Sequence, residues 1–111
     1  MGGAGSVGRY QYRRLDVGWQ DEQPGRPPPD RYRIFDSGGG AEPLVLERAA
    51  GEAPEAFAHR LRATVTDLLN VLGQDGWRVL YYAPIILRTP TGETFIGAWP
   101  SGTHFLVREA P

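Results

Sequence analysis

The 111-residue chain contains no cysteine and no lysine. The lack of cysteine excludes disulfide bonds, thiolate metal sites and a cysteine nucleophile. The lack of lysine excludes Schiff-base chemistry and the lysine of a phosphate-binding loop. Serine occurs only at Ser6, Ser37 and Ser101, and histidine only at His59 and His104. With so few reactive side chains, the sequence predicts a protein that is not an enzyme and that holds neither a cofactor nor a metal.

An excess of charge of one sign is also lacking, because the chain has 12 basic and 13 acidic residues and a net charge of -1. This balance argues against a broad field that attracts nucleic acids or membranes. No stretch approaches the ~18 apolar residues of a membrane span, and the first residues lack the pattern of a secretory signal. Arginine without lysine, beside 15 glycines and 10 prolines, is typical of a GC-rich bacterial genome. We therefore expect a bacterial protein of the cytoplasm.

The length fits one domain. Residues 1–8 are rich in glycine and predict a disordered tail, because glycine has little to bury and much entropy to lose. Residues 9–111 then form a single domain. A segment rich in proline and glycine at 18–30, with three consecutive prolines, is expected to be an inserted loop.

The clearest predicted element is a helix from about Pro54 to Asp75. Apolar residues recur there every three or four positions, which draws one stripe along the helix. The stripe consists of Phe57, Leu61, Val65, Leu68 and Leu72. Pro54 suits the first turn, and Gly76 suits the left-handed residue that ends a helix.

Strand patterns lie on both sides of this helix. A first strand begins at Arg9, and its alternation slips between Tyr12 and Leu15, which predicts a β-bulge or a shortened strand. Two short strands at 31–35 and 43–46 flank a glycine turn. After the helix, 77–82 predicts a central strand because it is apolar on both faces. The remaining strand patterns fall at 85–87, 95–99 and 103–109. The fold class is therefore α+β, with an antiparallel sheet of about four to six strands and one long helix on one face.

The segment from Leu69 to Trp77 reads Leu-Asn-Val-Leu-Gly-Gln-Asp-Gly-Trp. This segment resembles the signature of domain-of-unknown-function family 4177, whose members open with an aromatic strand, here Tyr10-x-Tyr12, and close on a strand like 105–108. The resemblance covers about half of the chain and implies the fold but no activity. Two additions depart from the family pattern, namely the insertion before the helix and an extra hairpin between Trp77 and Thr103.

The same segment has a structural interpretation. Gly76 permits a chain reversal, after which the Trp77 ring can be buried against the end of the helix. The residues of this structural motif are Leu68, Leu69, Asn70, Leu72, Gly73, Gly76 and Trp77.

Arginine and tyrosine alternate in the first third of the chain, which is the main functional hint. The predicted interaction surface consists of Tyr10, Tyr12, Arg13, Arg14, Tyr32 and Arg33. Tyrosine and arginine are enriched at protein interfaces. They can also stack on bases and contact phosphates, so a single-stranded nucleic-acid binder is an alternative. The neutral charge balance favours a protein interface, and hence an interaction or regulatory module.

An enzyme that uses His104 is a third, less favoured alternative. A serine–histidine pair can be drawn from Ser101 and His104, but no acid that would orient the histidine can be identified. His59 is expected on the polar face of the helix.

One helix leaves apolar residues on the other face of the predicted sheet uncovered. These residues are Tyr81, Ile85, Leu87, Phe95 and Trp99. An apolar face and open strand edges both need protection. We therefore expect a homo-oligomer, most simply a two-fold dimer that buries this face or pairs edge strands, and another protein is a possible partner.

Overall fold

The computed structural model describes residues 9–19, 30–40 and 42–110. The predicted tail at 1–8 and most of the predicted insertion lie outside the described residues. Gly18 and Trp19, which we expected to begin the insertion, instead extend the first strand.

The described elements follow one another as β1 (Tyr10–Trp19), β2 (Arg31–Asp36), β3 (Leu44–Glu47), α2 (Pro54–Gln74), β4 (Arg78–Pro84), β5 (Ile86–Arg88), β6 (Thr94–Ile96) and β7 (Gly102–Glu109). The α+β class, the long helix and the glycine turn between β2 and β3 are confirmed. The predicted strand at 95–99 is shorter in the structure, since β6 ends at Ile96.

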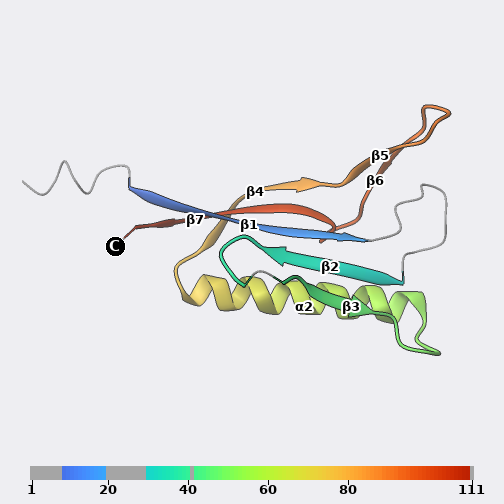
Figure 1. Cartoon of the computed structure of the whole chain (residues 1–111), viewed down its shortest axis with the longest axis horizontal. Coiled ribbons are helices and arrows are strands. Elements are labelled where there is room, and N and C mark those ends of the chain that lie inside the picture. The colour runs from blue at the N-terminus through green and yellow to red at the C-terminus, as the bar shows by residue number, and fades with distance from the viewer. Residues whose placement is uncertain (1–8, 20–29, 41, 111) are drawn as a thin grey trace, which may run out of the picture.

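Five strands form one antiparallel sheet in the order β3-β2-β1-β7-β4, and β5 and β6 form a separate pair (Figure 1). The prediction of a central strand at 77–82 is wrong, because β4 lies at the edge of the sheet. The apolar residues of β4 are not buried on both faces, since Leu80 is 62% exposed and Tyr81 is 60% exposed. The centre of the sheet is β1, which pairs with both β2 and β7.

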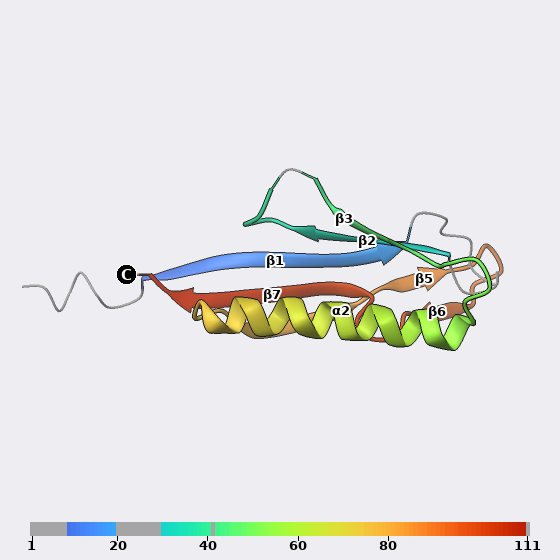
Figure 2. The ribbon, with the colours of Figure 1, turned by 90° about the horizontal axis from the view of Figure 1, so that it is seen from below.

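Helix α2 runs lengthwise along one face of the sheet (Figures 1 and 2). Its apolar stripe packs on alternate residues of the strands, and the sheet contributes Leu15, Val17, Ile34 and Leu106 to this core. At about 25 cal/mol per Å² of buried apolar surface, each such side chain contributes on the order of 1.5–3 kcal/mol. No helix within the described residues is long and apolar enough to cross a membrane.

The end of α2 has the geometry that the sequence motif predicts. Gly76 adopts a φ of 89°. The Trp77 amide donates to the carbonyl oxygen of Leu72, and the Gly76 amide donates to that of Gly73. These two bonds form a Schellman motif, which satisfies helix-terminal carbonyl groups. The reversal returns Trp77 to the core beside Leu72, with Leu68 and Leu69 partly buried against it.

The predicted bulge in β1 is wrong, because its pairing with β7 runs without interruption from Tyr10 to Val17. The alternation of apolar and polar residues is interrupted because Arg13, a charged residue, occupies a position on the helix side of the sheet, opposite Leu106. The irregularity lies instead in β4, where the register shifts between Val79 and Tyr81.

The β5–β6 pair forms an arm that extends away from the five-stranded sheet (Figure 1). Ile86 pairs with Ile96 and Leu87 with Phe95. Ile86 is 63% exposed and Ile96 is 68% exposed. An isolated two-stranded pair is only marginally stable in water, so this arm has little stabilisation of its own.

Gly102 at the start of β7 offers a direct test of the strand packing. Its φ is 138°, and a Cβ atom there would overlap the carbonyl oxygen of Ala83 on β4. We expect Gly102→Ala to lower the free energy of unfolding by roughly 2 kcal/mol or more, since both the backbone angle and the space exclude a side chain. Urea unfolding followed by circular dichroism measures this change.

Gly73 is the matched control, because it lies in α2 and a Cβ atom there would meet nothing within 4 Å. Gly73→Ala should raise the free energy of unfolding by about 0.5–1 kcal/mol through helix propensity. Equal effects of the two substitutions would contradict the packing of β7 against β4.

Candidate interaction surface

The side of the sheet away from α2, here called the open face, carries exposed aromatic residues. Strand residues alternate between the two faces, so the neighbours of the buried Leu15, Val17 and Leu106 point to the open face. Tyr12 is 72% exposed there and Phe105 is 40% exposed. The rings of Tyr81 and Phe105 lie side by side on β4 and β7, with their centroids 6.0 Å apart.

The open face also carries charges of both signs. Its charged residues are Arg14, Asp16, Arg31, Arg33, Glu47, Arg78 and Glu109. Two ion pairs lie within this group, Arg14 to Asp16 at 2.8 Å and Arg31 to Glu47 at 2.8 Å. Thr103 of β7 donates a hydrogen bond of 2.8 Å to the other oxygen of Asp16.

The six residues of the predicted interaction surface do not share one face. Tyr10, Tyr12, Arg14 and Arg33 lie on the open face, whereas Arg13 and Tyr32 lie on the side of α2. Tyr32 is half-buried, with its ring 5.6 Å from that of Phe57 and 6.1 Å from that of Trp19. Burial raises the pKa of Tyr32 above its ordinary value, because the phenolate would be poorly solvated there.

The apolar residues that we expected on one uncovered face also lie in different places. Tyr81 lies on the open face, and Leu87 and Phe95 belong to the arm. Trp99 contacts His104, which lies on the side of α2, with ring centroids 5.9 Å apart.

Arg13 holds together three distant parts of the chain. Its Nε and Nη2 atoms each donate a hydrogen bond of 2.6 Å to the Asp36 carboxylate. This bidentate pair raises the pKa of Arg13 and lowers that of Asp36. The guanidinium also lies 5.5 Å from the centroid of Trp77. Gly38 leaves the room for Arg13, because a Cβ atom at Gly38 would fall 2.6 Å from Arg13 Nε.

Arg108 contacts Trp77 as well, at 4.5 Å from the ring centroid. It donates to Gln11 at 2.6 Å and to the Asp75 carboxylate at 2.7 Å. Two hollows border this side chain. One of about 400 Å³ is lined by Gln11, Tyr12, Arg13, Gly38, Trp77 and Arg108. The other, of about 720 Å³, is lined by Tyr10, Asp75, Gly76, Arg78, Arg108 and Glu109.

His104 is buried with 1% of its surface exposed. Its Nε2 lies 3.0 Å from the carbonyl oxygen of Pro100, and its ring lies 4.7 Å from that of Tyr82. Burial lowers the pKa of His104, and the bond to Pro100 and the charge of Asp16 offset part of that effect. Because a carbonyl oxygen only accepts, Nε2 carries the proton in this bond. The geometry is that of a core histidine.

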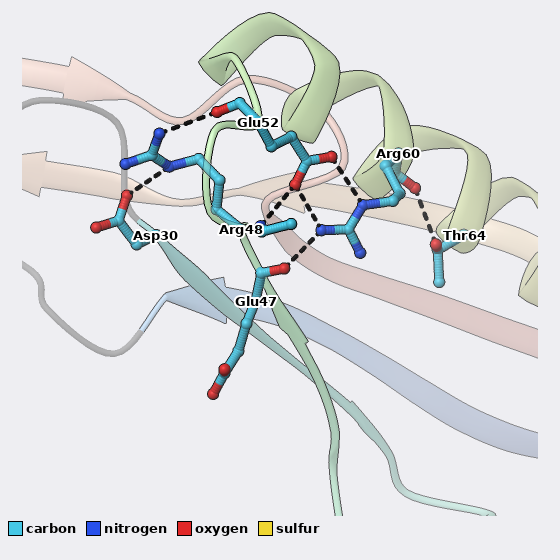
Figure 3. Close-up of polar contacts among 7 residues, drawn as sticks. Asp30, Glu47, Arg48, Glu52, Arg60 and Thr64 are labelled. Carbon is cyan, nitrogen blue, oxygen red and sulfur yellow. Dashed lines mark hydrogen bonds and ion pairs between the residues drawn. The ribbon is translucent and has the colours of Figure 1, made fainter.

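A second polar cluster joins the end of β3 to the start of α2 (Figure 3). The Glu52 carboxylate accepts hydrogen bonds from Arg60 at 3.0 and 2.8 Å and from the Ala49 amide at 2.9 Å. These bonds lower the pKa of Glu52 to about 2. The Arg48 side chain donates to the Glu52 carbonyl oxygen and to Asp30. Since Ala53 offers no capping side chain, the cluster fixes the entry of the helix instead.

Sequence reasoning did not identify this cluster, the Trp77 contacts or the two hollows. No helical spacing links Glu52 to Arg60, because Glu52 precedes the first residue of α2. Within the described residues, no group of three or more histidine, aspartate or glutamate side chains could hold a metal ion.

No family model, no curated protein and no solved structure matches the chain. The resemblance to domain-of-unknown-function family 4177 therefore stays a prediction.

The buried His104 predicts a dependence of stability on pH. Its pKa is lower in the folded than in the unfolded chain, so the unfolded chain binds more protons below pH ~6.5. We expect the free energy of unfolding to fall as the pH drops from 7.5 to 5.5, by at most about 1.4 kcal/mol per pH unit. Urea unfolding at three pH values measures the slope.

His104→Gln should flatten this slope, whereas His59→Gln, on the exposed surface of α2, should leave it as in the wild type. The window lies above the range in which carboxylates titrate. An unchanged slope in His104→Gln would show that His104 is not the responsible group.

Proposed function

We propose that the protein is a non-catalytic interaction module of a bacterial cytoplasm, and that two copies associate through the open face. The observation that carries this proposal is the aromatic character of a sheet face that α2 does not cover. Tyr12, Tyr81 and Phe105 expose 72%, 60% and 40% of their surface. Tyrosine and phenylalanine anchor protein interfaces because they bury large areas with few rotatable bonds.

The size of the open face suits a dimer. The five strands of the sheet have 10, 6, 4, 7 and 8 residues in the order β1, β2, β3, β4 and β7. With strands about 4.8 Å apart and a rise of about 3.3 Å per residue, they cover roughly 550 Å² in projection. A stable protein interface buries about 800 Å² of accessible surface on each partner. Because side chains project from the face, its accessible area exceeds its projected area. The open face therefore approaches about 800 Å² without any contribution from the arm.

The charges of the open face favour a second copy over a nucleic acid. Its four arginines are nearly balanced by three carboxylates, Asp16, Glu47 and Glu109. A two-fold interface must be complementary to itself, which a face with both signs can satisfy. A phosphate backbone requires an excess of positive charge.

The arm enlarges the surface available to the partner. A Cβ atom built on Gly18 would lie 3.9 Å from Ile85 Cδ1, which places Ile85 beside the open face at the base of the arm. Leu87 follows Ile85 by two residues and pairs with Phe95. Apolar side chains therefore continue from the sheet into the arm.

One observation favours single-stranded nucleic acid as a second candidate partner. Tyr12 and Phe105 lie on the two neighbouring strands β1 and β7, with Arg14 directly opposite Phe105. Bases stack on such aromatic platforms. Fluorescence anisotropy with labelled oligothymidine and oligouridine at low salt tests it, and binding that weakens steeply with salt would favour this candidate.

The dimer predicts a solution mass of about twice 12.2 kDa. Sedimentation velocity at micromolar concentration should give this mass for the wild type. Tyr12→Arg should give a monomer, because it replaces an exposed ring of the proposed interface with a charge that would have to be desolvated. Its circular dichroism spectrum should match that of the wild type, since Tyr12 is 72% exposed.

Val71→Arg is the matched control, because Val71 is 61% exposed on α2. It should leave the dimer intact. A wild-type monomer at 100 μM, or a dimer that Tyr12→Arg does not affect, would overturn the proposal.

A further inference from the structure

The N-terminal half of β1 extends beyond its neighbour β2. Pairing with β7 begins at Tyr10, whereas pairing with β2 begins only at Leu15. Both views show β1 continuing past the end of β2 (Figures 1 and 2). A stretch of a central strand therefore has a paired neighbour on one side only among the described residues.

The main-chain groups on the vacant side belong to Tyr10 and Tyr12. The Arg14 amide donates to Ser37 Oγ at 2.8 Å, and the Arg14 carbonyl oxygen accepts from the Ser37 amide at 2.9 Å. Residues two apart in a strand direct their main-chain groups to the same side. Tyr12 and Tyr10 thus present their amide and carbonyl groups in line with β2, and no described residue hydrogen-bonds to them.

A hollow lies directly beside this edge. It has a volume of about 400 Å³. Its lining consists of Gln11, Tyr12 and Arg13 of β1, Gly38 of the turn after β2, and Trp77 and Arg108. A strand added to β1 would place alternate side chains on the side of α2. One such side chain would enter the hollow.

The lining of the hollow fits a carboxylate. It contains two guanidinium groups and no acidic side chain. Arg13 uses Nε and Nη2 for Asp36, and Arg108 uses Nε and Nη1 for Gln11 and Asp75. Arg13 Nη1 and Arg108 Nη2 make no hydrogen bond to a described residue. Arginine donors form strong, directional bonds to carboxylates.

We propose that the β1 edge at Tyr10–Arg13 binds an extended peptide as an added strand, with an acidic side chain in the hollow. Addition of a strand takes affinity from main-chain hydrogen bonds and specificity from side-chain pockets. The outer edges of the sheet suit this role less. β4 is bulged and contains Pro84, and β3 has four residues. The added strand would use main-chain groups at the edge of β1, whereas the proposed dimer uses rings of the open face. Tyr12 contributes to both, its main chain to the edge and its exposed ring to the dimer.

The experiment uses three labelled peptides of the form Thr-Val-Thr-X-Thr-Val-Thr, in which X is Glu, Gln or Lys. Fluorescence anisotropy with the full chain should show that the Glu peptide binds about tenfold tighter than the Lys peptide, because a carboxylate accepts hydrogen bonds from arginine whereas an ammonium group only donates. Hydrogen exchange followed by NMR should show the Tyr12 amide exchanging fast in the free protein. The Glu peptide should slow that exchange by at least about tenfold.

Two variants at one position isolate the main-chain contribution. Tyr12→Pro and Tyr12→Val both lose the phenol, but only Tyr12→Pro loses the amide on the vacant side. Proline is tolerated there, since this amide is not part of the ladder with β7. Both variants lose the same ring from the hollow and from the open face, so a difference between them reports the amide alone. Tyr12→Pro should bind the Glu peptide at least about fivefold more weakly than Tyr12→Val does. Circular dichroism checks that both fold.

If Tyr12→Pro does not fold, Arg108→Met provides a second test of the site and Arg62→Met is its matched control. Arg62 is exposed on α2. Arg108→Met should reduce the preference for the Glu peptide over the Lys peptide, because one of the two guanidinium groups of the hollow is lost, and Arg62→Met should keep that preference. Equal binding of all three peptides, binding of none at 1 mM, or protection of amides on β3 or β4 instead of Tyr12 would overturn the proposal.

Discussion

The structure depends on one geometric constraint, which is that one helix, α2, covers the five-stranded sheet in the part of the chain that the structure describes. A helix with its side chains is about 10–12 Å wide, whereas five strands span roughly 24 Å. α2 therefore buries one stripe of one face, centred on Leu15, Val17 and Leu106. The other face keeps its aromatic rings in solvent. The proposed association follows from this one-sided coverage, because the rings of the open face have no described helix over them.

Much of the fold was predictable because its signals are local. The apolar stripe of α2 needs only a spacing of three and four residues, and the structure places its bounds within one residue of the prediction. The reversal at Gly76 and the burial of Trp77 were likewise predictable, because the residues that produce them are adjacent in the sequence. The glycine turn between β2 and β3 needed no distant partner either.

The strand order and the working face were not predictable, because they are set by contacts far apart in the sequence. From the sequence alone, Arg13 is expected to be one more surface cation. In the structure it lies on the helix side of the sheet, where it contacts Trp77 and binds Asp36, which is 23 residues away. The same long-range register decides that Tyr12 is exposed and Tyr32 is half-buried. Alternation alone cannot assign a face when a charged residue occupies a core-side position.

The arm of β5 and β6 has a practical consequence. Its turn, residues 89–93, is polar, exposed for the most part and held by bonds among its own threonine and glutamate residues. Loop tips of this kind tolerate insertions, since the added chain disturbs no buried contact. A fluorophore or an affinity tag placed in this turn would therefore report on the molecule from a point distant from both the helix and the β1 edge.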